Sequence, residues 1–256
     1  MSSAVRRVLV TGAGSGIGRG VATHLAAKGH HVFVTDLNVD PAHAVVEEIR
    51  GKGGSASAHK LDAGCTDSIQ ELFASLDQKP NVLVNNAGLQ HVSTLDEFPM
   101  NKWKLLVDVM LNGVAALTQA ALPTMREEGY GRIVNIGSIH SLVASPGKSA
   151  YVAAKHGLVG LSKVVALETA DSDITINTLC PSYVYTPLVE KQIAAQAELH
   201  GISEKEVVDN IMLRPMPKRN FIDIQELAGT CEFLMSDYAR NITAQTIALD
   251  GGWTAQ

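Results

Sequence analysis

Three residues near the middle of the chain have the spacing of a proton-transfer group. Ser138 precedes Tyr151 by thirteen residues, and Lys155 follows Tyr151 by four. Residues four apart on a helix share a face, so the Lys155 ammonium would favour the Tyr151 phenolate and lower the pKa of the tyrosine. Tyr151 could then accept a proton from an alcohol while hydride leaves, and the Ser138 hydroxyl could hold the substrate oxygen.

The same stretch contains His140 and Lys148, which such a proton relay does not need. Each of them alone would more often be a solvated loop residue. Together they flank the serine and the tyrosine with a cation and a hydrogen-bond donor, and ionised partners form the stronger hydrogen bonds. A carboxylate on the substrate would account for both residues, so we predict a small anionic substrate.

A glycine-rich segment near the N-terminus has the pattern of a dinucleotide-binding turn. The sequence "TGAGSGIG" (residues 11–18) follows an apolar strand and opens a helix, where backbone can approach a pyrophosphate closely. Asp36 lies 18 residues after Gly18, at the expected position for an acid that binds the ribose hydroxyls. Asp36 would repel a 2′-phosphate, and neither Ser15 nor Leu37 is basic. We therefore predict NAD rather than NADP as the cofactor.

Two further segments follow predicted strands, and we expect them at the same edge of the sheet as the glycine-rich turn. Asp62 follows the third expected strand, where its carboxylate could bond the adenine amino group; a role as a helix-entry residue before "TDSI" is equally compatible. "NNAG" (residues 85–88) ends the fourth strand, where Gly88 suits a close approach of backbone to ligand and the asparagine side chains can tie the loop together.

Apolar strands alternate with helical patterns along the whole chain. We expect strands at residues 6–11, 31–35, 55–62, 81–88, 131–138, 174–181 and 245–252, and helices at 17–28, 41–50, 67–76, 101–125, 151–170 and 224–235. Continuous apolar strands with helical crossovers predict an α/β fold, a parallel sheet with helices on both faces. No linker or repeat interrupts the pattern, so residues 1–256 are expected to form one domain.

Residues 182–220 depart from this alternation. They contain two helical patterns, "VEKQIAAQAELH" and "SEKEVVDNIML", and end in "RPMPKRN". A long excursion after the carboxyl end of a strand is where an active-site lid belongs, and we predict a lid here. The alternative is a surface insertion without a role at the site.

Composition narrows the possible partners and compartment. The net charge is −5, and no basic stripe appears, which argues against nucleic acid. No apolar run reaches the roughly 18 residues of a membrane span, and the N-terminus lacks the features of a signal peptide. The three cysteines are far apart and odd in number, so we expect no disulfide framework, and the histidine spacing suggests no metal site. A cytoplasmic protein is expected.

These motifs together resemble the short-chain dehydrogenase/reductase family along nearly the whole chain. The resemblance implies a seven-stranded Rossmann sheet, a homotetramer, and Tyr151 as the acid/base. It also implies that Lys155 holds the nicotinamide ribose and that Asn112, in "MLNGV", links Lys155 to solvent through water. From sequence alone Asn112 would be a polar residue inside a helix, which counts against the helix. The family usually has glycine where this chain has Ser182, so the resemblance does not fix the path of that turn.

Within the family, four segments are similar to D-3-hydroxybutyrate dehydrogenases: "NNAGLQH", "SIHSLVASPGKSAYVAAKHG", "CPSYVYTPLVEKQI" and "DGGWTAQ". This similarity implies NAD-dependent, reversible oxidation of (R)-3-hydroxybutyrate to acetoacetate. It implies a carboxylate site made of Gln90, His140, Lys148 and Gln192, with Tyr183 and Trp253 against the alkyl end. Those enzymes usually have tryptophan at the position of Tyr183, and a smaller ring with a polar tip could widen or wet the pocket.

The resemblance also completes the expected cofactor contacts, which are Gly12, Ser15, Gly16, Ile17, Gly18, Asp36, Leu37, Asp62, Ala63, Asn86, Ala87, Gly88, Tyr151, Lys155, Pro181, Val184 and Thr186. Two alternatives to the expected function remain open. One is a related oxidoreductase acting on another hydroxy acid or a neutral secondary alcohol. The other is a catalytically silent NAD-binding sensor.

Overall fold

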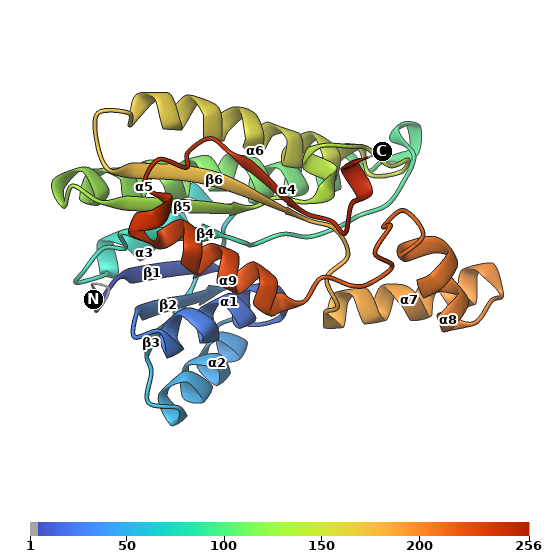
Figure 1. The fold of residues 1–256 in the computed structure, drawn as a ribbon, viewed down its shortest axis with the longest axis horizontal. Helices are drawn as coiled ribbons and strands as arrows, with labels where there is room; N and C mark the ends of the chain where they lie inside the picture. The colour runs from blue at the N-terminus through green and yellow to red at the C-terminus, as the bar shows by residue number, and fades with distance from the viewer. Residues whose placement is uncertain (1–4, 256) are drawn as a thin grey trace.

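Seven parallel strands form one central sheet in a computed structural model that describes residues 5–255 (Figure 1). The strand order is β3-β2-β1-β4-β5-β6-β7, which confirms the predicted seven-stranded sheet. The order reverses between β1 and β4, and in open α/β sheets ligands bind beyond the carboxyl ends of the strands at such a point. The strands are β1 Arg7–Thr11, β2 His31–Asp36, β3 Ser55–Lys60, β4 Val82–Asn85, β5 Gly131–Ile136, β6 Ile174–Pro181 and β7 Thr246–Leu249.

The central strands are apolar because both faces of the sheet are covered. All residues of β4, β5 and β6 are buried, and Val8 of β1 pairs with Val32 on one side and with Val82 on the other. Strands buried on both faces lose the alternation of apolar and polar residues that a half-exposed strand shows. The continuous apolar runs in the sequence therefore locate these strands well.

Helices pack on both faces of the sheet, as predicted. One face carries α1 (Gly16–Ala27), α2 (Val39–Gly51) and α9 (Ile224–Met235), whose buried side chains share one core cluster. The opposite face carries α3 (Thr66–Ser75), α5 (Gly113–Glu127) and α6 (Ser149–Glu168), which share a second cluster. Short 3₁₀ turns complete the described chain: η1 Leu95–Glu97, η3 Ile139–Ser141, η5 Asp237–Ala239 and η6 Trp253–Ala255.

The helix expected at residues 101–125 is interrupted. It consists of α4 (Met100–Val107), a π-helical turn η2 (Asp108–Asn112) and α5. By length and composition alone, the stretch Met100–Glu127 could cross a membrane. Its buried side chains, among them Leu106, Leu117 and Met125, belong to the core clusters, which is the packing of a core helix of this domain.

The lid segment, residues 182–220, projects from the end of the sheet in Figure 1. It forms α7 (Pro187–His200), α8 (Glu204–Val207) and the π-helical turn η4 (Val208–Met212). Thr186 caps α7, because its hydroxyl accepts a hydrogen bond from the backbone of Val189 at 3.3 Å. The two ends of the segment meet where Val184 forms a parallel bridge with Ile222.

Ser182 begins the lid segment without strain. Among the described non-glycine residues, only Arg219 and Ala244 have a positive φ, so this turn does not require glycine. The backbone N–H of Ser182 donates to the carbonyl of Leu249 at 3.0 Å, and its hydroxyl contacts the sulfur of Met216 at 3.3 Å. Serine therefore fits the turn and adds a contact to the lid segment.

Candidate active site

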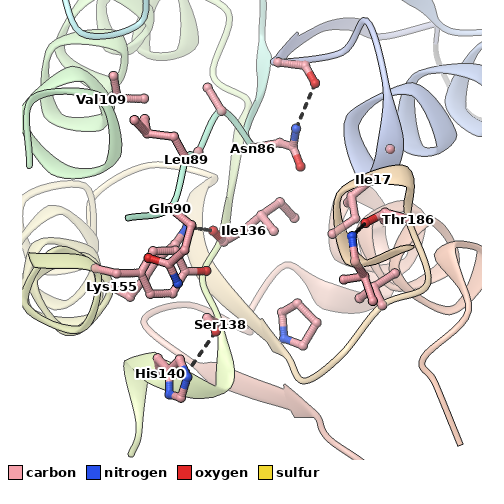
Figure 2. A pocket seen from close by; sticks show the side chains of 18 of the residues that line it. Ile17, Asn86, Leu89, Gln90, Val109, Ile136, Ser138, His140, Lys155 and Thr186 are labelled. Atoms are coloured by element: carbon pink, nitrogen blue, oxygen red, sulfur yellow. Dashed lines mark hydrogen bonds between the residues drawn. The ribbon is translucent and has the colours of Figure 1, made fainter. Parts of the chain in front are cut away.

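A cavity of about 780 Å³ lies beyond the carboxyl ends of the strands, between the sheet and the lid segment. Its walls come from the glycine loop, the ends of β2 to β6, the start of α6, the lid helix α7 and the C-terminal turn. Figure 2 shows the arrangement, with Ser138, His140 and Lys155 on one side and Ile17 and Thr186 on the other. This is the position that the strand order predicts for a ligand.

The glycine loop forms one wall of the cavity. Gly12 and Gly16 have φ angles of +61° and +53°, a backbone conformation that favours glycine. A Cβ on Gly12 would lie 3.0 Å from the Cα of Ala87, and one on Gly16 would point toward Thr186 across the cavity. Asn86 fixes the loop, since its side-chain amide donates to the carbonyls of Thr11 at 2.9 Å and Gly12 at 3.1 Å. The loop is thus held in the shape of a backbone cradle.

Two carboxylates lie beyond this cradle. Asp36, at the end of β2, accepts a hydrogen bond from the backbone N–H of Gly14 at 3.0 Å and lines the cavity. Asp62 also lines the cavity while one of its oxygens accepts from the backbone N–H of Gly64 at 2.9 Å. This bond stabilises the turn that precedes α3, whose N-cap residue is Cys65, and the expected bond of Asp62 to adenine stays a prediction. A backbone cradle at the N-terminus of α1, followed by an acid at the end of β2, fits a dinucleotide.

Ser138, Tyr151 and Lys155 meet at the opposite wall. Ser138 caps η3, where its hydroxyl accepts from the backbone of His140 at 3.1 Å. Tyr151 and Lys155 lie one turn apart on α6, and the ammonium is 5.6 Å from the centre of the tyrosine ring. The ammonium also donates to the carbonyl of Ile136 at 2.6 Å, at the end of β5. Strand β5 and helix α6 thus hold a hydroxyl, a phenol and an amine at one place.

The electrostatics of this group differ from the expectation. Burial raises the pKa of Tyr151, and a hydrogen bond with Ser138 opposes that rise only in part. Burial lowers the pKa of Lys155 to about 8. The expected lowering of the tyrosine pKa is therefore wrong for this structure, because removal of the phenolate from water outweighs the hydrogen bond with Ser138. The resting pair is a phenol beside an ammonium, and a phenol can donate a proton to a ketone.

His140 and Lys148 lie side by side next to this group. The ammonium of Lys148 is 3.3 Å from Nε2 of His140, and the imidazole meets the ring of Tyr151 edge-on at 6.1 Å. Burial, reinforced by Lys148, lowers the pKa of His140 to about 4. The imidazole is therefore neutral at neutral pH and accepts from Lys148, so Lys148 alone supplies the positive charge.

The low pKa of His140 makes stability sensitive to acid. As the pH falls below 6.5 the unfolded chain binds a proton at this histidine, whereas the folded chain does so only near pH 4. The free energy of unfolding should therefore decrease by about 2 kcal/mol between about pH 7 and pH 5 from this group alone. Urea unfolding of the wild type and His140→Asn at both pH values will measure it. An equal pH dependence in both proteins would contradict the low pKa.

The other predicted substrate residues also line the cavity. Gln90 follows β4 and lies near Lys155 in Figure 2. Tyr183 stacks on Trp253, with ring centres 6.1 Å apart and planes at 28°. The Asp250 carboxylate accepts hydrogen bonds from the backbone N–H groups of Gly252 and Thr254, which fixes the turn that presents Trp253. Gln192 reaches the cavity from α7.

Two predicted residues lie elsewhere. Asn112 is exposed on η2, lies outside the cavity wall and donates to Asp108 at 2.9 Å, and its expected water-mediated link to Lys155 stays a prediction; the buried residue nearby is Met110. Residues two apart on a helix point to opposite sides, which explains why Asn112 faces out where Met110 faces in. Gly18 is absent from the cavity wall and supports the loop from behind, because a Cβ there would lie 2.4 Å from the carbonyl oxygen of Gly12.

The structure also adds residues that sequence reasoning missed. They line the cavity, and none of them has a titratable side chain: Thr11, Leu61, Leu89, Val92, Leu105, Val109, Ile136, Gly137, Ile139, Ser182, Pro187, Val189, Ala195 and Gln196. Of these, only Gln196 could have been predicted from the sequence, because it follows Gln192 by four residues on a predicted helix and therefore lies on the same helix face.

Comparisons with known proteins agree with this geometry. A family profile described as short chain dehydrogenase matches residues 6–197. The chain is 41% identical to a D-beta-hydroxybutyrate dehydrogenase of Rhizobium meliloti, covering 98% of this chain and 99% of that protein. It is 40% identical to one of Cupriavidus necator, covering 98% of each chain.

A solved structure from Agrobacterium tumefaciens, described as a candidate 2-deoxy-D-gluconate 3-dehydrogenase with bound NADP, superposes with a TM-score of 0.86. It is 31% identical and covers 98% of this chain and 97% of that chain. The profile match spans most of the chain, and the two curated relatives are similar to it from end to end. The chain belongs to the short-chain dehydrogenase family.

Proposed function

We propose that this oxidoreductase interconverts (R)-3-hydroxybutyrate and acetoacetate with NAD. The observation that supports this substrate is the Lys148 ammonium, held 3.3 Å from His140 in the cavity wall beside Tyr151. A half-buried cation without a carboxylate partner in the described chain is suited to a substrate carboxylate. The two bacterial D-beta-hydroxybutyrate dehydrogenases, similar over their full length, support the same substrate.

The residues at the opposite wall then have defined parts in the reaction. Gly12, Gly16 and Asp36 would hold the dinucleotide, which when bound accepts or supplies the hydride at its nicotinamide ring. In reduction the Tyr151 phenol gives its proton to the ketone oxygen as the carbon gains the hydride, and the hydroxy acid forms. Oxidation is the reverse of this step and requires the Tyr151 phenolate, which accepts the proton of the substrate hydroxyl. The Ser138 hydroxyl holds the substrate oxygen in place, and the Lys155 ammonium supplies positive charge near the phenolate.

A spectrophotometric assay with both enantiomers of 3-hydroxybutyrate tests this proposal. Formation of reduced nicotinamide with the R enantiomer and little with the S enantiomer is the expected result. Such turnover would also remove the possibility of a catalytically silent NAD sensor. Turnover of neutral secondary alcohols with no activity on either enantiomer would contradict the proposed substrate.

The choice of NAD rests on Asp36. Its carboxylate would repel a 2′-phosphate, and the nearby Arg19 is engaged by Glu48 at 2.7 Å. Asp36→Asn keeps an acceptor for Gly14 and removes the charge, so the ratio of kcat/KM for NADP to that for NAD should rise about tenfold or more. Steady-state kinetics with both cofactors will measure the ratio. Asp40→Asn, at an exposed acid on α2, is the matched control, and equal ratios in both variants would refute the role of Asp36.

A further inference from the structure

The lid helix α7 presents one face to the cavity and to Tyr183. Val189 and Ile193 on this helix share a core cluster with the Tyr183 ring. Gln192 and Gln196 lie between and after them at helical spacing, so all four residues occupy one face. Gln192 and Gln196 both line the cavity. This face therefore places a second amide one turn, about 6 Å, beyond Gln192.

The amide of Gln196 is incompletely bonded. Its Oε1 atom is buried and makes no hydrogen bond with any of the residues 5–255. Buried polar groups in folded proteins nearly always have a partner, and leaving one unpaired is costly. Because Gln196 also lines the cavity, a rotation of its side chain or of its amide would bring this oxygen to a bound ligand.

The hydroxyl of Tyr183 also has no hydrogen-bond partner among residues 5–255, although it is not buried as the Gln196 oxygen is. The described chain offers it no hydrogen bond, and the residue lines the cavity. The ring itself is firmly placed, stacked on Trp253 on one side and packed against the lid cluster on the other. A fixed ring with a free phenol presents a polar group at a defined place in the cavity.

We propose that Gln196 and Tyr183 form a second polar subsite, and that the preferred substrate is a hydroxy acid with a further hydroxyl group beyond the reacting carbon. This inference rests on the proposed function and extends its substrate class: 3-hydroxybutyrate is turned over, and a 3-hydroxy acid with the further hydroxyl is turned over more efficiently. A hydroxyl both donates and accepts, so it satisfies the phenol and either orientation of the amide. A second carboxylate could only accept, so it could pair with the phenol and the amide NH2 group but would leave Oε1 unpaired.

A matched pair of substrates separates this subsite from the rest of the pocket. 3,4-Dihydroxybutyrate and 3-hydroxypentanoate have the same number of non-hydrogen atoms and differ only in that carbon 4 carries a hydroxyl in the first and a methyl group in the second. The wild type should show a kcat/KM about tenfold or more higher for the dihydroxy acid. 3-Hydroxybutyrate, which has neither group, reports on the reaction without the subsite.

Two variants then test the residues. Gln196→Leu should bring the ratio of kcat/KM for the dihydroxy acid to that for 3-hydroxypentanoate to within about twofold of one. Tyr183→Phe should lower the ratio by about threefold, as expected for one lost hydrogen bond. Far-UV circular dichroism and the thermal unfolding midpoint of both variants, compared with the wild type, show that they fold. Gln70→Leu, at an exposed glutamine of α3, is the matched control and should keep the wild-type ratio.

The possible outcomes distinguish a failure of the polar subsite from a failure of the proposed function. Turnover of all three acids with a preference for 3-hydroxypentanoate would overturn the polar subsite and leave the proposed function intact. A hydroxyl preference that persists in both variants would overturn the assignment to Gln196 and Tyr183. Absence of turnover with all three acids, in protein that binds reduced nicotinamide cofactor, would overturn the proposed function and the subsite together.

Discussion

Tyr151→Phe is expected to lower kcat by about three to four orders of magnitude, because the phenol is the group that exchanges a proton with the substrate oxygen. Phenylalanine preserves the ring that packs against the buried helix residues Met110 and Ala154. Affinity for the reduced cofactor, measured by nicotinamide fluorescence, should therefore stay within about threefold of the wild type. Turnover of 3-hydroxybutyrate in both directions measures the loss.

Tyr185→Phe is the control for this variant. Tyr185 is 52% exposed and meets Phe221 edge-on at 5.4 Å, outside the cavity wall. Removal of its hydroxyl should leave kcat unchanged. If Tyr151→Phe retained more than about a tenth of the wild-type kcat, another group would have to transfer the proton, since general acid–base catalysis contributes at least about a hundredfold.

Lys148→Met is expected to raise KM for the hydroxy acid by about a hundredfold, on the order of 3 kcal/mol, while kcat changes little. Methionine keeps much of the apolar stem and removes the charge that would pair with the carboxylate. A neutral secondary alcohol, if turned over, should show no such change in KM. The measurement is a set of steady-state kinetics with the acid and the alcohol for each protein.

Lys163→Met provides the matched control, because Lys163 is exposed on the same helix and lies outside the cavity wall. It removes the same charge from the protein and should leave KM unchanged. An equal rise in KM in both variants would indicate a general effect of net charge. Equal losses on acid and alcohol in Lys148→Met would mean that Lys148 supports the site without binding a carboxylate.

The sheet could be predicted because its pattern is local. Buried parallel strands are short continuous apolar runs, and "VLVN" or "RIVNI" has few alternative interpretations. The helix at residues 224–235 was predicted with the bounds that the structure shows, since Asp223 caps it and Glu226 completes a capping box. Local rules of this kind do not depend on how distant segments pack.

The interruption of the long helix was not predictable in this way. A π-helical turn at Asp108–Asn112 changes which side chains face the core, and no proline or glycine lies within it to mark it. Asn112 is the last residue of this turn, and the sequence marked it only as a polar residue that counts against a regular helix. Sequence periodicity describes a regular helix and is insensitive to one extra residue per turn.

The active-site residues were predictable as a set, whereas their protonation was not. Spacing identified Ser138, Tyr151 and Lys155, because residues four apart on a helix and residues at strand ends have known positions. The pKa of Tyr151 depends on how much of the cavity wall surrounds it, which is a property of the folded chain. The unpaired amide of Gln196 likewise becomes visible only when its surroundings are known.

The meeting of the two ends of the lid segment has a consequence for redesign. The bridge between Val184 and Ile222, with the hydrogen bond from the Ile222 amide to the Tyr183 carbonyl, closes the segment at its base. When the first and last residues of a segment lie side by side, the segment can be replaced by another whose ends are equally close, and the strands and helices on either side keep their positions. Exchange of the residues between these two points with those of a relative would therefore replace Gln192 and Gln196 together and leave the glycine loop, Asp36 and Lys148 in place.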